Sequence, residues 1–295
     1  MIRTKRQDLP TGLWIVATPI GNLGDMSLRA QEALQTADVI LCEDTRRTAQ
    51  LLSGLHLTRT GKLERLDAHA TRSHIDRWVD QLKDGASIAL VTDGGTPGIS
   101  DPGSSFVAAA RLGGVRITPV PGPSAVTALL SVAGMSATDF QFLGFFPRKT
   151  TEGQEVLNQL TQSHAPAITI WYESPKRIRK TLELLALNHP EAQVVAAKEL
   201  TKVFEKFFSG TSVQVRNQVV IETETEGELG EWCFAVFLPT EVRRSEQSSD
   251  WVKALHCLLD ARVLASEAAR QVSQHFGAPK KEVYEAALKF LGKKY

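Results

Sequence analysis

The sequence lacks long hydrophobic runs, a cysteine framework and an excess of charge of either sign. No apolar run approaches the roughly 20 residues of a membrane-spanning helix, and the N-terminal stretch MIRTKRQDLP has no apolar core of the signal-peptide type. The cysteines, Cys42, Cys233 and Cys257, lie far apart and form no CxxC pair, which argues against a disulfide framework or a thiolate zinc site. These absences predict a cytoplasmic protein without a membrane-spanning part.

Two further absences concern charge and phosphate binding. Lysine and arginine (34) balance aspartate and glutamate (33) to a net charge of +1, which excludes binding of polyanions through global charge but permits a local basic face. Neither GxGxxG nor GxxxxGK[ST] occurs, so dinucleotide and triphosphate cofactors are disfavoured. What is present is a chain of 295 residues, 42% of them hydrophobic, which is enough for two domains and a small appendage.

The first part of the chain alternates apolar runs with amphipathic helical segments. The runs LWIVAT, DVILCED, ASIALVT and VRITPV have the composition of buried parallel strands. The segments between them carry apolar residues at helical spacing. This pattern predicts an N-terminal α/β domain with a mostly parallel sheet over residues 1–137.

The second part of the chain has more strand-like runs than helices. Five apolar runs and two clear helices, at 151–163 and 175–187, predict a second α/β domain with a mixed sheet over 138–240. A polar linker and three short helical segments follow, which predict a small helical domain over 241–295.

Four loops that follow the predicted strands of the first domain are rich in glycine, proline and polar residues. They are TPIGN (18–22), EDTRR (43–47), DGGTPGISDPG (93–103) and PGPSA (121–125). Because ligands of open α/β sheets bind beyond the carboxyl ends of the strands, the loops predict one composite site. Asp93 can accept a hydrogen bond from an ammonium or hydroxyl group, and the glycines beside it let the backbone approach a ligand. Any one of these glycines or prolines alone is more simply explained by a tight turn.

Eight segments, in this order and at these intervals, resemble the ribosomal RNA small subunit methyltransferase I family. Its members are S-adenosylmethionine (SAM)-dependent ribose methylases with a tetrapyrrole-methylase type of fold. The segments are VATPIGNLGD, EDTRRT, VTDGGTPGISDPG, PVPGPSA, GFFPRK, YESPKR, KELTKVFE and LGEW. The resemblance runs from Gly12 to about Leu238. One segment departs from the family pattern, because LDAHATRS keeps His69 but has Ala70 and Thr71 where the family tends to have asparagine and glutamate.

The resemblance implies two α/β domains with SAM in the cleft between them, and a homodimer. It implies methyl transfer to the 2′-oxygen of a decoding-centre cytidine, with small-subunit ribosomal RNA or the assembled small subunit as the partner. The SAM contacts that it implies are Pro19, Ile20, Asp93, Thr96, Gly98, Ser124, Ala125, Tyr172 and Glu173.

The implied reaction needs a group that draws the proton from a ribose hydroxyl. Glu43 directly follows a buried strand and is the leading candidate, with Asp101 and Lys149 behind it. Capping of the helix that begins at Thr45 explains Glu43 and Asp44 equally well.

Cations near the ends of predicted strands are the candidates for contacts with RNA phosphates. They are Arg46, Arg47, Arg148, Lys149, Lys176 and Arg177. For the first two, a solvated helix face is an equally good explanation.

Other interpretations of the sequence stay open. His69 and His74, with Asp67 and Asp76, fit a surface turn better than a metal site, since no HExxH-type spacing occurs and methyl transfer needs no metal. A small-molecule methylase acting on a tetrapyrrole is the nearest rival within the fold. A rival of another class is a non-catalytic nucleic-acid-binding protein that uses the C-terminal helices, although a packing domain explains those helices slightly better.

Overall fold

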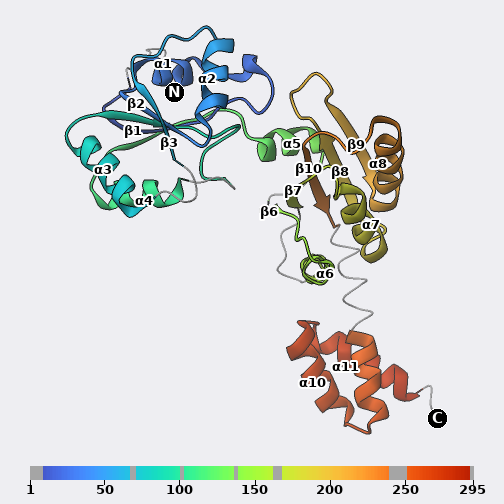
Figure 1. Ribbon diagram of the computed structural model, residues 1–295. Coiled ribbons are helices and arrows are strands. Elements are labelled where there is room, and N and C mark those ends of the chain that lie inside the picture. The colour runs from blue at the N-terminus through green and yellow to red at the C-terminus, as the bar shows by residue number, and fades with distance from the viewer. Residues whose placement is uncertain are drawn as a thin grey trace, which may run out of the picture. The chain divides into compact units, whose positions relative to one another are not determined.

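The computed structural model describes residues 9–66, 71–99, 103–135, 139–161, 168–238 and 251–292. The chain divides into two compact units (Figure 1), of which the first comprises Met1–Val132 and Lys198–Lys206 and the second Ala133–Ala197 and Phe207–Tyr295. Each unit contains a five-stranded sheet with helices packed on it, so the α/β class predicted from the sequence is confirmed. The assignment of Lys198–Lys206 to the first unit was not predicted.

The sheet of the first unit is parallel throughout. Its strand order is β3-β2-β4-β1-β5, and every pair runs parallel. The strands are β1 (Gly12–Val16), β2 (Val39–Cys42), β3 (Lys62–Arg65), β4 (Ser87–Leu90) and β5 (Ile117–Val120). Four of them coincide with the predicted apolar runs. The sequence analysis missed β3, whose residues KLER read as polar because this short strand lies at the sheet edge.

Helices cover both faces of this sheet (Figure 1). Helices α1 and α2 contribute to one apolar cluster, around Trp14 and Leu34, and α3 and α4 contribute to another, around Trp78 and Phe106. The bounds are α1 (Leu28–Thr36), α2 (Thr45–Gly54), α3 (Arg72–Lys83), α4 (Ser104–Leu112) and α5 (Ala125–Ala133), with a short 3-10 helix at Leu23–Asp25. Burial on both faces explains why β2 and β4 are continuous apolar runs.

The strand order brings the predicted site loops together. Strand β1 pairs with β4 on one side and with β5 on the other, in a register that places Ile15 beside Leu90 and Val16 beside Val120. The loops that follow these three strands therefore leave the sheet at one edge, as expected for a ligand site of an open α/β sheet.

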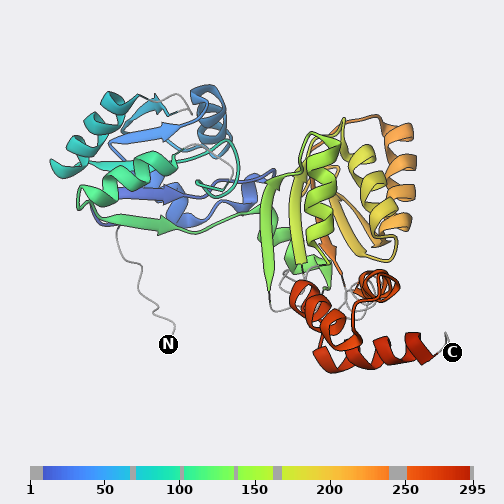
Figure 2. The same cartoon turned by 90° about the horizontal axis from the view of Figure 1, so that it is seen from below.

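The second unit has a mixed sheet of order β6-β7-β10-β8-β9, seen from below in Figure 2. Strand β7 pairs parallel with β6 and antiparallel with β10, as the excess of strands over helices predicted. The strands are β6 (Phe140–Phe145), β7 (Ile168–Glu173), β8 (Gln193–Lys198), β9 (Lys206–Thr211) and β10 (Trp232–Phe237). Their core includes Trp171 and Phe234 and is shared with α6 (Thr150–Gln159), α7 (Ile178–Asn188) and α8 (Ser212–Glu226).

Helices at the C-terminal end of the chain pack on one another. A helix over 251–260, α10 (Ala265–Phe276) and α11 (Lys280–Gly292) enclose a separate apolar cluster around Leu255, Val272 and Val283. All three were predicted at these places. No helix within the described residues has the length and apolar character needed to cross a membrane.

Candidate functional site

Backbone hydrogen bonds tie the loops of the first unit into one cluster. The amide of Thr18 donates to the carbonyl of Gly95 (2.9 Å), and the amide of Gly95 donates back to the carbonyl of Thr18 (3.0 Å). The hydroxyl of Thr96 donates to the carbonyl of Pro123 (3.1 Å). The loops after β1, β4 and β5 therefore have a fixed relative position. The sequence predicted only that these loops lie close together.

Glycine is required where these loops meet. Gly95 has φ +91°, and a Cβ atom there would lie 3.4 Å from Cγ2 of Ile20. A Cβ at Gly94 would lie 3.3 Å from the carbonyl oxygen of Pro19. A side chain at Gly94 would press on the turn after β1, whereas at Gly95 the positive φ is what favours glycine. Gly98, with φ +86°, has open space beside it.

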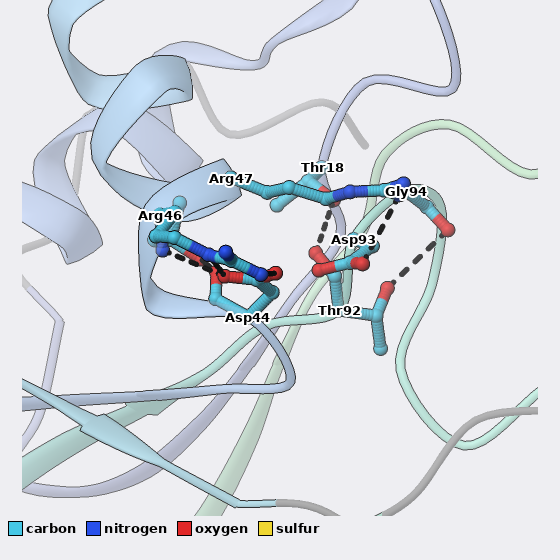
Figure 3. A network of polar contacts seen from close by, with 8 residues as sticks. Thr18, Asp44, Arg46, Arg47, Thr92, Asp93 and Gly94 are labelled. Atoms are coloured by element: carbon cyan, nitrogen blue, oxygen red, sulfur yellow. Dashed lines mark hydrogen bonds and ion pairs between the residues drawn. The ribbon is translucent and has the colours of Figure 1, made fainter.

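Asp93 stands at the start of this glycine loop and forms an ion pair with Arg47 (Figure 3). The distance from Nη1 of Arg47 to Oδ2 of Asp93 is 3.1 Å, and the two side chains are 65% and 25% exposed. At this exposure the pair contributes about 0.2–1 kcal/mol. The sequence analysis assigned Asp93 to the cofactor and Arg47 to RNA and gave no sign that they touch.

Of the two acidic residues that precede α2, Glu43 and Asp44, only one is the helix N-cap. Asp44 is the helix N-cap, because its carboxylate accepts from the backbone amide of Arg46 (2.9 Å) and also from the Arg46 guanidinium. These hydrogen bonds hold the pKa of Asp44 well below its usual value. Glu43 is not the cap, so of the two explanations left open by the sequence, capping belongs to Asp44.

Glu43 has a carboxyl group that binds its proton more tightly than usual. Burial raises its pKa, and the negative charge of Asp93 raises it further, whereas Arg47 and Arg65 act in the opposite direction. A carboxylate with a raised pKa is a better proton acceptor than an ordinary one. The direction of this shift fits the sequence prediction of Glu43 as the proton acceptor, which stays a prediction.

The segment between β8 and β9 packs on the turn after β1, which the sequence analysis missed. The amide of Asn22 donates to the hydroxyl of Thr201 (3.2 Å), and a Cβ at Gly21 would lie 3.0 Å from the carbonyl oxygen of Leu200. Glu199 and Thr201 have positive φ values of 56° and 64°, which is uncommon for residues with side chains. The sequence signal for this contact is the glycine of TPIGN.

In the second unit, Glu173 and Arg177 form an ion pair at the end of β7. The Glu173 side chain is fully buried and accepts hydrogen bonds from the amide of Ser174 (2.6 Å) and the hydroxyl of Thr181 (2.7 Å). The guanidinium of Arg177 lies 2.5 Å from Glu173 and donates to the carbonyl of Phe146 (3.0 Å). Glu173 and Arg177, assigned from the sequence to cofactor and RNA, are thus engaged with each other.

Tyr172 is half-buried and directly precedes Glu173 in β7. Its ring contacts the rings of Phe142 and Phe145, with centroids 4.7 Å and 5.7 Å away. It lies in the second unit, whereas the loops after β1, β4 and β5, including Ser124 and Ala125 at the start of α5, belong to the first.

The PRK and PKR segments lie side by side because Arg177 reaches the carbonyl of Phe146. Arg148 and Lys176 are exposed. Lys149 is 75% exposed and forms an ion pair with Glu152 (2.7 Å), which raises the pKa of the lysine. A general base must be neutral, whereas the ion pair with Glu152 favours the charged form of this lysine, so Lys149 fits the predicted phosphate contacts better than the predicted base.

Several predicted residues fall outside the described part of the chain. Asp101 and the segment of His69 and Ala70 lie there. Within the described residues, no cluster of three metal-ligating side chains occurs. His74 lies on α3 with its ring 6.1 Å from that of Trp78.

The residues of the first unit fit the cofactor that the resemblance implies. SAM carries an ammonium group and a sulfonium, and Asp93 offers a partly exposed carboxylate beside glycine backbone that can approach such groups. Hydrogen bonds of Thr18, Gly95 and Thr96 fix this backbone in place. Ligand sites in proteins are usually formed before the ligand binds, and this backbone meets that condition.

The chain is similar to known proteins over most of its length. Residues 12–215 match the family of tetrapyrrole (corrin/porphyrin) methylases. The ribosomal RNA small subunit methyltransferase I of Xylella fastidiosa (strain Temecula1) is 41% identical over 93% of this chain and 98% of its own length. That of Neisseria meningitidis serogroup B is 38% identical over 95% of this chain and 94% of its own length. Among solved structures, uroporphyrin-III C-methyl transferase from Thermus thermophilus, complexed with S-adenyl homocysteine, has a TM-score of 0.50 at 14% identity and covers 76% of this chain and 96% of its own.

Arg177→Ala should destabilise the second unit, because it leaves the buried Glu173 carboxylate without its counter-charge. We expect a loss of about 2–3 kcal/mol in free energy of unfolding, discounted for the partial exposure of Arg177. Lys176→Ala, at the exposed neighbouring position, is the matched control and should change stability by less than about 0.5 kcal/mol. Urea unfolding followed by tryptophan fluorescence measures both. Equal midpoints for the two variants would contradict a stabilising role of the Glu173–Arg177 ion pair.

Proposed function

The chain belongs to the ribosomal RNA small subunit methyltransferase I family, within the tetrapyrrole methylases, and from this premise we propose that it methylates a ribose 2′-oxygen of small-subunit ribosomal RNA. The methyl donor is SAM, and the proposed acceptor is a decoding-centre cytidine. The proposal rests on the near-full-length match to relatives of that name, together with the hydrogen-bonded loop cluster that includes Asp93. The same match favours an RNA substrate over a tetrapyrrole and an enzyme over a non-catalytic binding protein.

We assign the cofactor to the loops of the first unit. Pro19, Ile20, Thr96, Gly98 and Ser124 lie on those loops and Ala125 is the first residue of α5, and they would present backbone and side chains to SAM. Asp93 would accept a hydrogen bond from the ammonium group of SAM. Tyr172 and Glu173, at the end of β7, are the further cofactor contacts that the resemblance implies, and the Glu173 carboxylate is held by Arg177 and Thr181.

SAM, when bound, supplies the electrophilic methyl group. Methyl transfer is an in-line displacement, so the protein must hold the attacking oxygen in line with the methyl carbon and the sulfur. Glu43 would take the proton of the ribose hydroxyl at its carboxylate, which its raised pKa favours. Asp101 remains a second candidate for this role.

Exposed cations are the proposed contacts with the RNA backbone. Arg46 and Arg47 lie in the first turn of α2, and Arg148, Lys149 and Lys176 lie on the adjoining PRK and PKR segments of the second unit. Arginine and lysine bind phosphate oxygens without reading sequence. Arg177 is removed from this set because its guanidinium is held by Glu173 and Phe146.

We also propose that the protein is a cytoplasmic homodimer, as the resemblance implies. Strand β6 lies at the edge of its sheet and exposes Phe140 (51%), Leu143 (44%) and Phe145 (59%). Exposed apolar side chains on an edge strand are suited to burial against a second copy. Sedimentation equilibrium gives the mass in solution, and a monomer at micromolar concentration would refute the dimer.

Labelled methyl groups from SAM should appear on small-subunit ribosomal RNA purified from a strain without this enzyme. The assay is run with free RNA and with assembled subunits, followed by mapping of the modified nucleotide and its sugar. Label on a ribose 2′-oxygen of a decoding-centre cytidine is the expected result. Label on a base, or no label with either substrate, would overturn the proposed substrate.

Glu43→Gln should lower kcat by about 10²- to 10⁴-fold at saturating RNA and SAM, because the amide cannot take a proton. In the wild type, kcat should rise with pH as Glu43 loses its proton, at a pH above that of an ordinary carboxyl group. Asp93→Asn removes a negative charge that raises the pKa of Glu43, so it should move this rise to lower pH. A Glu43→Gln variant with wild-type kcat would exclude Glu43 as the base.

Alanine at Arg148, Lys149 and Lys176 should weaken RNA binding and leave SAM affinity unchanged. Removing a cation that binds one phosphate should reduce the slope of log K against log salt by about one. Fluorescence anisotropy with labelled RNA at several salt concentrations measures the slope, and calorimetry measures SAM binding. If the slope of the triple variant equals that of the wild type, the PRK and PKR segments do not contact RNA.

A further inference from the structure

Arg47 connects the proposed cofactor contacts with the proposed RNA contacts. It belongs with the cations that would hold RNA, yet its guanidinium lies 3.1 Å from the carboxylate of Asp93 (Figure 3), the residue placed against the cofactor. While this pair is formed, Arg47 is partly neutralised as a phosphate ligand and Asp93 is partly neutralised as an ammonium ligand. The two proposed binding events therefore depend on the same ion pair.

The neighbouring Arg46 has no such connection. Its backbone amide, Nε and Nη2 donate to Asp44 at 2.9, 3.2 and 2.8 Å, and Asp44 is the cap of the same helix. Arg46 is therefore held by its own helix rather than by the glycine loop. The two arginines are adjacent in sequence and differ in the carboxylate that they contact.

Of the two partners in the ion pair, Arg47 is the one free to move. The loop that carries Asp93 is fixed on both sides, because the hydroxyl of Thr92 donates to the carbonyl of Gly94 (3.3 Å) and Gly95 is bonded twice to Thr18. Arg47 is 65% exposed and has a long side chain, which can reorient in solvent at little cost.

We propose that Arg47 is a latch that couples cofactor binding to RNA binding, an inference that rests on the proposed function. Without SAM, Arg47 neutralises Asp93. When the ammonium group of SAM takes over Asp93, Arg47 is released and its charge becomes available for an RNA phosphate. The Arg47 guanidinium then no longer has Asp93 as its partner and can pair with a phosphate, so SAM raises the affinity for RNA, and by thermodynamic linkage RNA raises the affinity for SAM by the same factor.

RNA binding by the full-length protein is measured by anisotropy at low salt in three conditions: no addition, S-adenosylhomocysteine, and methylthioadenosine. S-adenosylhomocysteine retains the ammonium group and transfers no methyl, whereas methylthioadenosine lacks the amino-acid part. For the wild type we expect S-adenosylhomocysteine to tighten RNA binding about two- to fivefold, the factor corresponding to an exposed ion pair. Saturating methylthioadenosine should leave RNA affinity unchanged.

Variants separate the latch from simple charge effects. Arg47→Gln should bind RNA more weakly and lose the dependence on S-adenosylhomocysteine, while binding S-adenosylhomocysteine at least as tightly as the wild type. Arg46→Ala is the matched control: it should weaken RNA binding but keep the full dependence. Asp93→Asn should bind RNA without cofactor as tightly as the wild type does with it, because Arg47 is already released.

Two results would overturn the latch. The first is equal RNA affinity of the wild type with and without S-adenosylhomocysteine. The second is weaker S-adenosylhomocysteine binding by Arg47→Gln, which would make Arg47 a ligand of the cofactor carboxylate. Either result alongside intact cofactor binding and methyl transfer leaves the proposed function standing, whereas absence of cofactor binding by the wild type would remove both.

Discussion

The reciprocal backbone hydrogen bonds between Thr18 and Gly95 are the constraint on which the site depends. They join the loops after β1 and β4, neighbouring strands of the parallel sheet, just beyond the last paired residues. Because Gly95 can adopt a positive φ without a side-chain clash, the two loops close on each other and the position of Asp93 is set. The ion pair with Arg47 follows from that position, and Asp93 adds to the rise in the pKa of Glu43 that burial causes.

Much of the fold was predictable from the sequence, because the central strands are buried on both faces and read as apolar runs. The exceptions have physical causes. Strand β3 is a charged edge strand. Helix α8 was missed because its first residues, SVQVRNQVV, alternate valine with polar residues as a strand does. The helix is instead begun by a capping box between Thr211 and Gln214, a local signal that outweighs the β-like alternation.

The site was predictable as a set of loops but not as a set of contacts. Convergence of the loops follows from sheet topology, which the apolar runs determine. The partner of each charged side chain does not, because it depends on loop conformation: Lys149 turns to Glu152, Arg177 to Glu173 and Arg47 to Asp93. The arginines therefore differ in environment: Arg177 is partly buried against its acid, whereas Arg47 is exposed.

The packing of Lys198–Lys206 on the turn after β1 has a consequence for biosynthesis. Asn22 and Thr201 are 179 positions apart, and the segment that carries Thr201 connects two strands of the other unit's sheet. On the ribosome, the first sheet can assemble early, but this contact must wait until β8 and the loop after it have emerged. The N-terminal unit is thus completed only late in translation, and a fragment that stops at the first domain boundary would lack one of the walls around Gly21.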